Sequence, residues 1–250
     1  MLNHMTTPWP DPVQMGRDHV CLFLDVDGTL LEFAPTPDAA RADAPLQQLL
    51  AAVSQHFGGA VALVSGRTLG SLDALFAPLQ LPAAGIHGFE RRSADGTVHL
   101  PTLPPGVLDP VRDRLAAFAR AQPGVLLEDK GSALALHFRG ARGVRAEAHL
   151  VIADVAAKLD PAFAVLQGEQ VLEIKPASRN KASAIEAFMK EPPFAGRRPV
   201  YIGDDVTDFD GFAAVRRNGG FDIAVGDRVS ARWALADPSA VRQWLGMLLP

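Results

Sequence analysis

Acidic residues follow two apolar runs of this 250-residue chain, at 20–24 and at 200–202. They are Asp25 and Asp27 after the first run, and Asp204, Asp205 and Asp208 after the second. Two carboxylates at alternate positions of an extended chain leave it on the same side. Clustered carboxylates repel one another unless a cation neutralises them, and Mg²⁺ prefers oxygen ligands of this kind. The pattern predicts a magnesium site built from both acidic segments.

A hydroxyl and an amine complement these carboxylates. Ser65 follows the apolar run at 60–64, and Lys181 opens a helical pattern. A hydroxyl donor and a point positive charge suit the oxygens of a phosphoryl group. Taken separately, Ser65 is more often a helix N-cap and Lys181 a solvated helix start. Together with the acidic segments, they predict chemistry at a phosphate.

The hydrophobic periodicity predicts the elements that position these groups. Apolar runs that read as buried strands alternate with helical patterns, and the runs lie at 20–24, 60–64, 83–86, 200–202 and 221–225. This alternation is typical of an α/β fold with a doubly wound parallel sheet. Because open parallel sheets bind ligands at the carboxyl ends of their strands, we expect the polar segments to meet there.

The order of elements changes after a Pro-rich break at 101–106. A helix at 111–119, an alternating strand segment at 125–138, a helix at 144–159 and a hairpin signal at Gly168-Glu169 follow. This order predicts a smaller α+β insert with an antiparallel sheet. The predicted division is a flexible arm at 1–18, a core at 19–102 and 175–250, and a cap at 103–174.

Composition excludes several classes of protein. Hydrophobic residues make up 48% and charged residues 21%, which is typical of a globular chain and not of a disordered one. The net charge of −4 is mild and evenly spread, so we expect neither a nucleic-acid nor a membrane partner. Cys21 is the single cysteine, and no apolar run has the length of a signal peptide or membrane span. We expect a cytoplasmic protein with a small-molecule substrate.

Four strings, in this order, resemble the motifs of the haloacid dehalogenase superfamily of aspartate-nucleophile phosphatases. They are DVDGT, LVSGR, Lys181 and GDDVTD, and the insert resembles the superfamily's C2-type cap. Three further strings are similar to trehalose-6-phosphate phosphatases: GIHGFERR (85–92), LEDKGSALALHFR (127–139) and VLEIKPASRNKASAI (171–185). The resemblance implies Mg²⁺-dependent hydrolysis of trehalose 6-phosphate, the last step of trehalose biosynthesis. It also implies a functional link to the trehalose-phosphate synthase.

The same resemblance implies a role for each candidate residue. Asp25 is the nucleophile that forms an aspartyl-phosphate, Asp27 is the general acid and base, and Ser65 and Lys181 hold the transferring oxygens. The implied metal residues are Asp25, Asp27, Asp204, Asp205 and Asp208. Sugar recognition is assigned to Glu128, Lys130, Glu173 and Lys175, with Gly66, Arg67, His87 and Glu90 as further candidates on core loops. Where the family usually carries another acidic residue, this chain has Phe209, which changes the outer surroundings of the metal.

Two alternatives stay open. The core motifs do not identify the sugar, so a related phosphatase for another sugar phosphate is one alternative. The other is a non-catalytic partner of the synthase. Such pseudoenzymes normally lose a catalytic carboxylate, whereas Asp25, Asp27 and Asp204 are all present. A panel of sugar phosphates would separate these functions.

Overall fold

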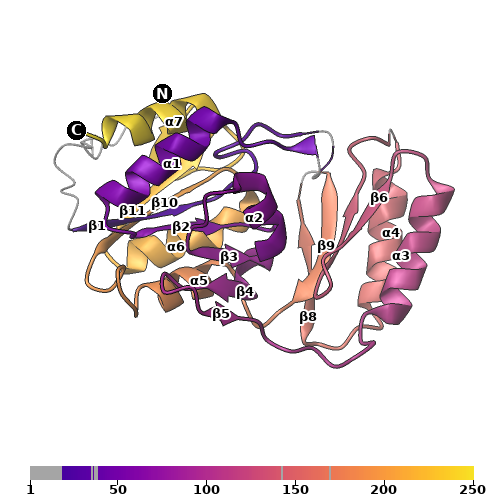
Figure 1. Ribbon diagram of the computed structural model, residues 1–250. Helices are drawn as coiled ribbons and strands as arrows, with labels where there is room; N and C mark the ends of the chain where they lie inside the picture. The colour runs from indigo at the N-terminus through magenta and orange to yellow at the C-terminus, as the bar shows by residue number, and fades with distance from the viewer. Residues whose placement is uncertain (1–18, 35, 37–38, 142, 169) are drawn as a thin grey trace.

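The computed structural model describes residues 19–34, 36, 39–141, 143–168 and 170–250. The predicted arm at 1–18 and the turn residue Glu169 lie outside the described residues. Two β-sheets form a larger and a smaller part that lie side by side (Figure 1). The chain passes from one part to the other through two linkers, one after residue 99 and one after residue 176.

The larger sheet has eight strands. They are β1 Val20–Leu24, β2 Val61–Val64, β3 Ala83–Gly85, β4 Glu90–Arg92, β5 Val98–His99, β10 Arg198–Gly203, β11 Phe221–Val225 and β12 Trp233–Leu235. Their order is β12-β11-β10-β1-β2-β3-β4-β5, with parallel pairing from β12 to β3 and antiparallel pairing of β4 and β5. The predicted α/β class is therefore confirmed. The sequence pattern did not predict β4, β5 and β12, because β4 and β5 carry no apolar run and that of β12 is short.

Helices cover both faces of this sheet (Figure 1). They are α1 Ala44–His56 and α7 Pro238–Met247 on one face, α5 Lys181–Phe188 and α6 Phe209–Arg217 on the other, and α2 Leu69–Phe76 beside β3. Every residue of β1 is buried because the strand lies between β10 and β2 under both helical layers. Phe23 of β1 packs against Phe188 and Phe194, with ring centroids 5.8 and 5.4 Å away.

A capping box fixes the start of α5. The Asn180 side chain accepts a hydrogen bond from the backbone N–H of Ser183, and the Ser183 hydroxyl accepts one from the backbone N–H of Asn180. These reciprocal bonds satisfy amides that the first helical turn leaves unpaired. Lys181 is the first residue of the helix, so its position is set by this cap.

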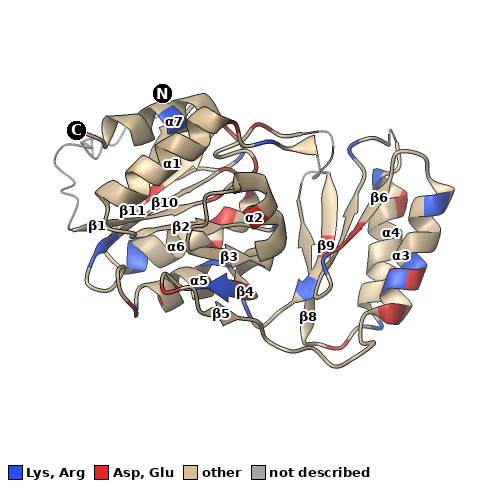
Figure 2. Cartoon of the chain, viewed as in Figure 1, with Lys and Arg blue, Asp and Glu red and all other residues tan. Residues whose placement is uncertain are grey.

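The smaller sheet is antiparallel and has its own core. Its strands are β6 Leu126–Asp129, β7 Leu134–His137, β8 Phe163–Gln167 and β9 Val171–Pro176, in the order β6-β7-β9-β8. The helices α3 Asp109–Ala121 and α4 Arg145–Ala156 cover one face and turn charged residues outward (Figure 2). β9 continues to Pro176, past the boundary placed at 174. None of the helices in the described ranges has the length and apolar character needed to cross a membrane.

The strand segment at 125–138 forms the two strands β6 and β7, and its alternating part, 133–138, was predicted to be half exposed. Leu134, Ala135 and Leu136 are all fully buried. One face of β7 lies under the helices of the insert, and the other faces the larger part, where Ala133 packs with Ile86 and Phe89. The period of two in β7 therefore reflects two different buried faces rather than one buried and one solvent-exposed face.

Candidate active site

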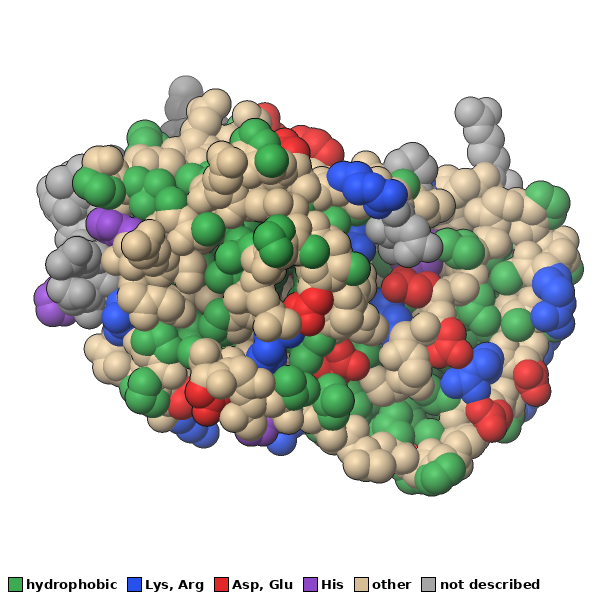
Figure 3. Space-filling model, in the orientation of Figure 1, with side chains coloured by type: hydrophobic (Ala, Val, Ile, Leu, Met, Phe, Trp, Pro, Cys, Tyr) green, Lys and Arg blue, Asp and Glu red, His purple; other side chains and the backbone are tan. Residues whose placement is uncertain are grey.

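A cavity of about 190 Å³ lies between the carboxyl ends of the core strands and the smaller sheet. Charged side chains gather along the seam between the two parts in the space-filling view (Figure 3). Predicted residues from the core and the insert line the cavity: Asp25, Asp27, Ser65, Gly66, Arg67, His87, Glu128, Lys130, Glu173, Lys181, Asp204 and Asp205. Residues more than a hundred positions apart in the sequence thus share one cavity.

Asp25 and Lys181 form a buried ion pair at the core end of this cavity. Asp25 directly follows β1, and the Lys181 Nζ donates to its Oδ1 at 2.7 Å. Both side chains are almost fully buried. Burial raises the pKa of Asp25 well above its usual range, against the effect of Lys181. The acidic neighbours outweigh the desolvation of Lys181 and raise the pKa of that ammonium.

Asp208 holds Lys181 in place. Lys181 and the hydroxyl of Tyr201 both donate to the Asp208 Oδ1. The Oδ2 accepts the backbone N–H groups of Asp204 and Asp205, at 2.8 and 2.9 Å. Because both oxygens are engaged and Asp208 does not line the cavity, it acts on the site through Lys181.

The acidic cluster has the donors that a hard cation needs. One oxygen each from Asp25, Asp204 and Asp208 lies within 4.8 Å of the others, and all three side chains are buried. Burial and the neighbouring Asp208 raise the pKa of Asp204 to about 6. Gly28, at a φ of +86°, leaves room for this cluster, because a Cβ there would lie 2.2 Å from an Asp204 oxygen. The residues fit a divalent cation, which would relieve the repulsion among these carboxylates.

The guanidinium of Arg67 holds the Asp27 carboxylate through two hydrogen bonds. The Arg67 Nε and Nη2 each donate to one Asp27 oxygen at 2.7 Å. Such a bidentate pair fixes the plane of the carboxylate as well as its position. Ser65, buried on the same loop, accepts the backbone N–H of Arg67 at 3.2 Å and lines the cavity. The general acid–base candidate and the hydroxyl candidate are thus held by one loop.

Lys130 joins the insert to the core. Its ammonium donates to the Glu173 carboxylate within the insert and to the Gly66 carbonyl of the core, both at 2.9 Å. The Nε2 of His87 lies 3.4 Å from the same Glu173 carboxylate. Burial opposes ionisation of Glu173, but Lys130 and His87 outweigh it and hold its pKa well below the usual range.

His87 is buried in a strained conformation beside the cavity. Its φ is +54°, the left-handed region that residues other than glycine rarely adopt. Within the described residues, the His87 Nδ1 and the Glu173 Oε1 are buried without a hydrogen-bond partner. Unpaired polar atoms next to a cavity are groups that a ligand can satisfy.

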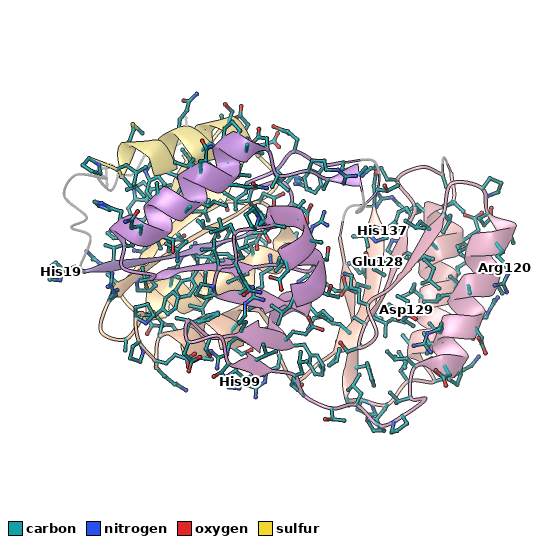
Figure 4. All side chains as sticks on the ribbon, in the orientation of Figure 1. His19, His99, Arg120, Glu128, Asp129 and His137 are labelled. Atoms are coloured by element: carbon teal, nitrogen blue, oxygen red, sulfur yellow. The ribbon has the colours of Figure 1, made fainter. Side chains whose placement is uncertain are left out.

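A second polar pair belongs wholly to the insert. Glu128 and His137 lie next to each other on β6 and β7, facing the core (Figure 4). The His137 Nε2 is 2.8 Å from the Glu128 Oε2. Burial raises the pKa of Glu128, but the contact with His137 and the charge of Lys130 outweigh it, so the pKa is lowered. His137 was not among the residues predicted from the sequence, yet it lines the cavity.

Two predicted substrate residues lie outside the cavity. The Glu90 carboxylate accepts the backbone N–H of Leu69 at 2.8 Å, at the start of α2. The Lys175 ammonium donates to the carbonyls of Pro176 and Arg179, at 3.1 and 2.8 Å. Both groups are engaged in holding loops together, which keeps them from the cavity.

The cavity also contains residues that the sequence did not predict as site residues. Phe33 and Arg228 line it, and Arg228 forms an ion pair with Asp204. Neither belongs to one of the four motif strings. The sequence contains one indication that Tyr201 lies near the site. It precedes Gly203, the first residue of the GDDVTD string, by two positions on a buried strand, so both lie on the same side of the sheet. Phe209 opens α6, where it is half exposed and does not line the cavity.

Two solved structures have the same fold as this chain. The chain has the fold of a haloacid dehalogenase-like hydrolase from Bacteroides thetaiotaomicron, at a TM-score of 0.65, 15% identity and coverage of 91% of this chain and 98% of the other. It also has the fold of the C. albicans trehalose-6-phosphate phosphatase C-terminal domain, at a TM-score of 0.84, 21% identity and coverage of 96% and 97%.

The sequence comparisons are more specific. The family model for trehalose-phosphatase matches residues 23–241, and this chain belongs to that family. It is 44% identical to a probable trehalose-phosphate phosphatase of Sinorhizobium fredii, over 89% of this chain and 84% of the relative. It is 40% identical to the trehalose-6-phosphate phosphatase of Escherichia coli, over 98% and 91%.

Proposed function

We propose that this chain hydrolyses trehalose 6-phosphate to trehalose and phosphate, as the last step of trehalose biosynthesis. Its family and its relatives at 40–44% identity support this activity. The observation that carries the chemistry is the buried cluster of Asp25, Lys181 and Asp204 at the core end of a cavity whose other end is polar.

Asp25 is the nucleophile of this mechanism. Its carboxylate attacks phosphorus and forms an aspartyl-phosphate, and the sugar oxygen departs. Lys181, 2.7 Å away, holds one carboxylate oxygen and leaves the other for attack. Lys181 and Ser65 then contact the oxygens of the transferring group. Because phosphoryl transfer depends mainly on positioning and charge stabilisation, these few groups suffice.

Asp27 moves the protons. It protonates the departing sugar oxygen and later takes a proton from the water that hydrolyses the aspartyl-phosphate. The two bonds from Arg67 keep its carboxylate facing the cavity during both steps. Loss of this orientation would affect both halves of the reaction.

Asp25 and Asp204 would hold a Mg²⁺ ion, with the main-chain carbonyl of Asp27 as a further oxygen. When bound, the ion supplies positive charge that stabilises the transferring phosphoryl group. Asp208 contributes by orienting Lys181, and Asp205 lines the cavity beside them.

The insert, 103–174, acts as a cap that selects the sugar. A disaccharide offers many hydroxyl groups, and the buried unpaired atoms of His87 and Glu173 would be satisfied by them. The cap opens about its two linkers to admit substrate and closes to exclude water. We further propose a cytoplasmic location and a functional link to the synthase that makes the phosphorylated sugar.

Phosphate release from a panel of sugar phosphates tests this proposal. Trehalose 6-phosphate, sucrose 6-phosphate and glucose 6-phosphate are compared with Mg²⁺, with chelator, and with Mg²⁺ restored. Selective and Mg²⁺-dependent release from trehalose 6-phosphate is expected. Equal rates on the other two substrates would reassign the enzyme to another sugar phosphate. Turnover of none of them would favour a non-catalytic role.

A further inference from the structure

Arg228 pairs with one of the carboxylates of the acidic cluster. It lies in the loop between β11 and β12, and its Nη2 donates to the Asp204 Oδ2. Its side chain is 29% exposed, whereas that of Asp204 is 2% exposed. The other oxygen of Asp204, Oδ1, accepts the Thr29 hydroxyl at 3.2 Å. Both oxygens of this carboxylate are thus engaged by donors of the protein.

Two positively charged side chains of the protein pair with different carboxylates of the acidic cluster. Lys181 pairs with Asp25 and Asp208, and Arg228 pairs with Asp204. A divalent cation that takes Asp204 as a ligand must therefore approach a guanidinium that is already on the same carboxylate. Like charges at this separation repel, so the cation and Arg228 oppose each other at Asp204.

Phe33 provides a surface for Arg228 away from the carboxylate. The Arg228 guanidinium carbon is 4.4 Å from the centre of the Phe33 ring, and that of Arg139 is 4.8 Å from it. Arg139 follows β7 of the cap and donates to the Ala34 carbonyl of the core at 3.3 Å. Guanidinium groups over an aromatic face are held by the ring quadrupole. One core side chain thus contacts the Asp204 partner and a cap residue together.

We propose that Arg228 is a positioning residue that holds the Asp204 carboxylate until the divalent cation takes it, and that Phe33 transmits this exchange to Arg139 of the cap. This inference rests on the proposed function only in taking the acidic cluster as the magnesium site. Loading of the metal shifts Arg228 further onto the ring and weakens the contact of Arg139 there. The cap is then freer to open when the metal is in place.

Calorimetric titration of Mg²⁺ into the full chain tests the exchange. Arg228→Ala is expected to tighten Mg²⁺ binding roughly fivefold, the factor that corresponds to a partly exposed ion pair. Arg232→Ala removes the same charge from a nearby exposed position, where Arg232 pairs with Asp222, and is expected to leave binding unchanged. Unchanged or weaker binding in Arg228→Ala, or equal tightening in Arg232→Ala, would overturn the proposal.

A third variant covers the case in which Arg228→Ala does not fold. Arg228→Lys keeps the charge but loses the fork and the planar contact with Phe33. It is expected to bind Mg²⁺ more tightly than the wild type and less tightly than Arg228→Ala. Tightening by the full fivefold expected of Arg228→Ala would count against the competition, because the repelling charge is still present in Arg228→Lys.

Hydrogen exchange tests the link to the cap. In the wild type, Mg²⁺ is expected to speed exchange in peptides that cover 134–141. Phe33→Leu, at a half-exposed position, is expected to abolish that response while the variant still binds Mg²⁺. An equal response in the two proteins would exclude Phe33 as the link. Neither measurement uses turnover, so an inactive chain would overturn the proposed function and leave this inference standing.

Discussion

The two ends of the cavity are built in different ways. At the core end, Asp25, Lys181 and Asp208 come from one part of the molecule, and their bonds are complete within it. At the cap end, Lys130 and Glu173 reach across the seam to Gly66 and His87, and two buried atoms there have no partner among the described residues. A self-contained charged cluster suits a step common to all substrates. A network completed across the seam between the two parts suits recognition of one of them.

The largest test of this contrast is Asp25→Asn. We expect turnover to fall at least about a thousandfold on every substrate, because the proposed nucleophile is lost while its size and its contact with Lys181 are kept. Phosphate release on trehalose 6-phosphate and on an aryl phosphate measures the loss. The circular dichroism spectrum serves as the control for folding. Retention of a tenth of the activity would exclude Asp25 as the nucleophile.

Lys181→Met tests whether the core end is also a centre of stability. The change leaves Asp25 and Asp208 buried without their cation, so the free energy of unfolding should fall by about 3 kcal/mol or more. Urea unfolding without Mg²⁺ measures it.

Lys158→Met is the matched control. Lys158 follows the end of α4 and forms an exposed ion pair with Asp154 of that helix. Little change is expected there. If both variants lose the same amount, the buried cluster contributes no more than a surface pair does.

Glu173→Gln tests the cap end. It should lower kcat/KM for trehalose 6-phosphate relative to an aryl phosphate by between about tenfold and a hundredfold, since an acceptor for a sugar hydroxyl and the charge partner of Lys130 are lost. Steady-state kinetics on both substrates gives the ratio. Glu147→Gln, on the exposed side of α4, should keep the wild-type ratio. A parallel fall on both substrates would assign Glu173 to the chemistry.

The smallest effect concerns pH. Burial lowers the pKa of His87, so the folded chain resists a proton that the unfolded chain accepts near pH 6.5. The free energy of unfolding should therefore fall as the pH drops below about 6.5, by at most about 1.4 kcal/mol per pH unit from this group. The carboxyl of Glu173, with its lowered pKa, contributes only at lower pH, below its unfolded value.

Unfolding between pH 7 and 5.5 measures this slope. His87→Gln should reduce it, whereas His99→Gln, at an exposed position, should keep it. A slope that survives in His87→Gln would mean that another group supplies it.

The sequence predicted the core end far better than the cap end. Asp25 and Ser65 each follow a buried apolar strand, and parallel pairing brings such strand ends to one edge. The bond of Lys130 to Gly66 depends on how the cap sits on the core, and no local pattern encodes that geometry. Arg228 was missed for a similar reason, because a loop arginine carries no periodic signal.

Two predicted substrate residues, Lys175 and Glu90, lie outside the cavity for local reasons. Glu173 and Lys175 occupy alternate positions of β9, so the strand period placed both on one side. The long Lys175 side chain instead reaches carbonyls of the following linker. Glu90 was drawn to the unpaired amide at the start of α2, which attracts a carboxylate. In both places, nearby backbone groups competed for the charge that the site was expected to use.

Tyr201 is the single tyrosine of the chain, and its hydroxyl donates to Asp208, the carboxylate that also pairs with Lys181. Biosynthetic incorporation of fluorotyrosine would therefore give one ¹⁹F resonance, from a side chain that contacts the acidic cluster. That resonance would follow metal loading, phosphorylation and product release in a single sample without further labelling.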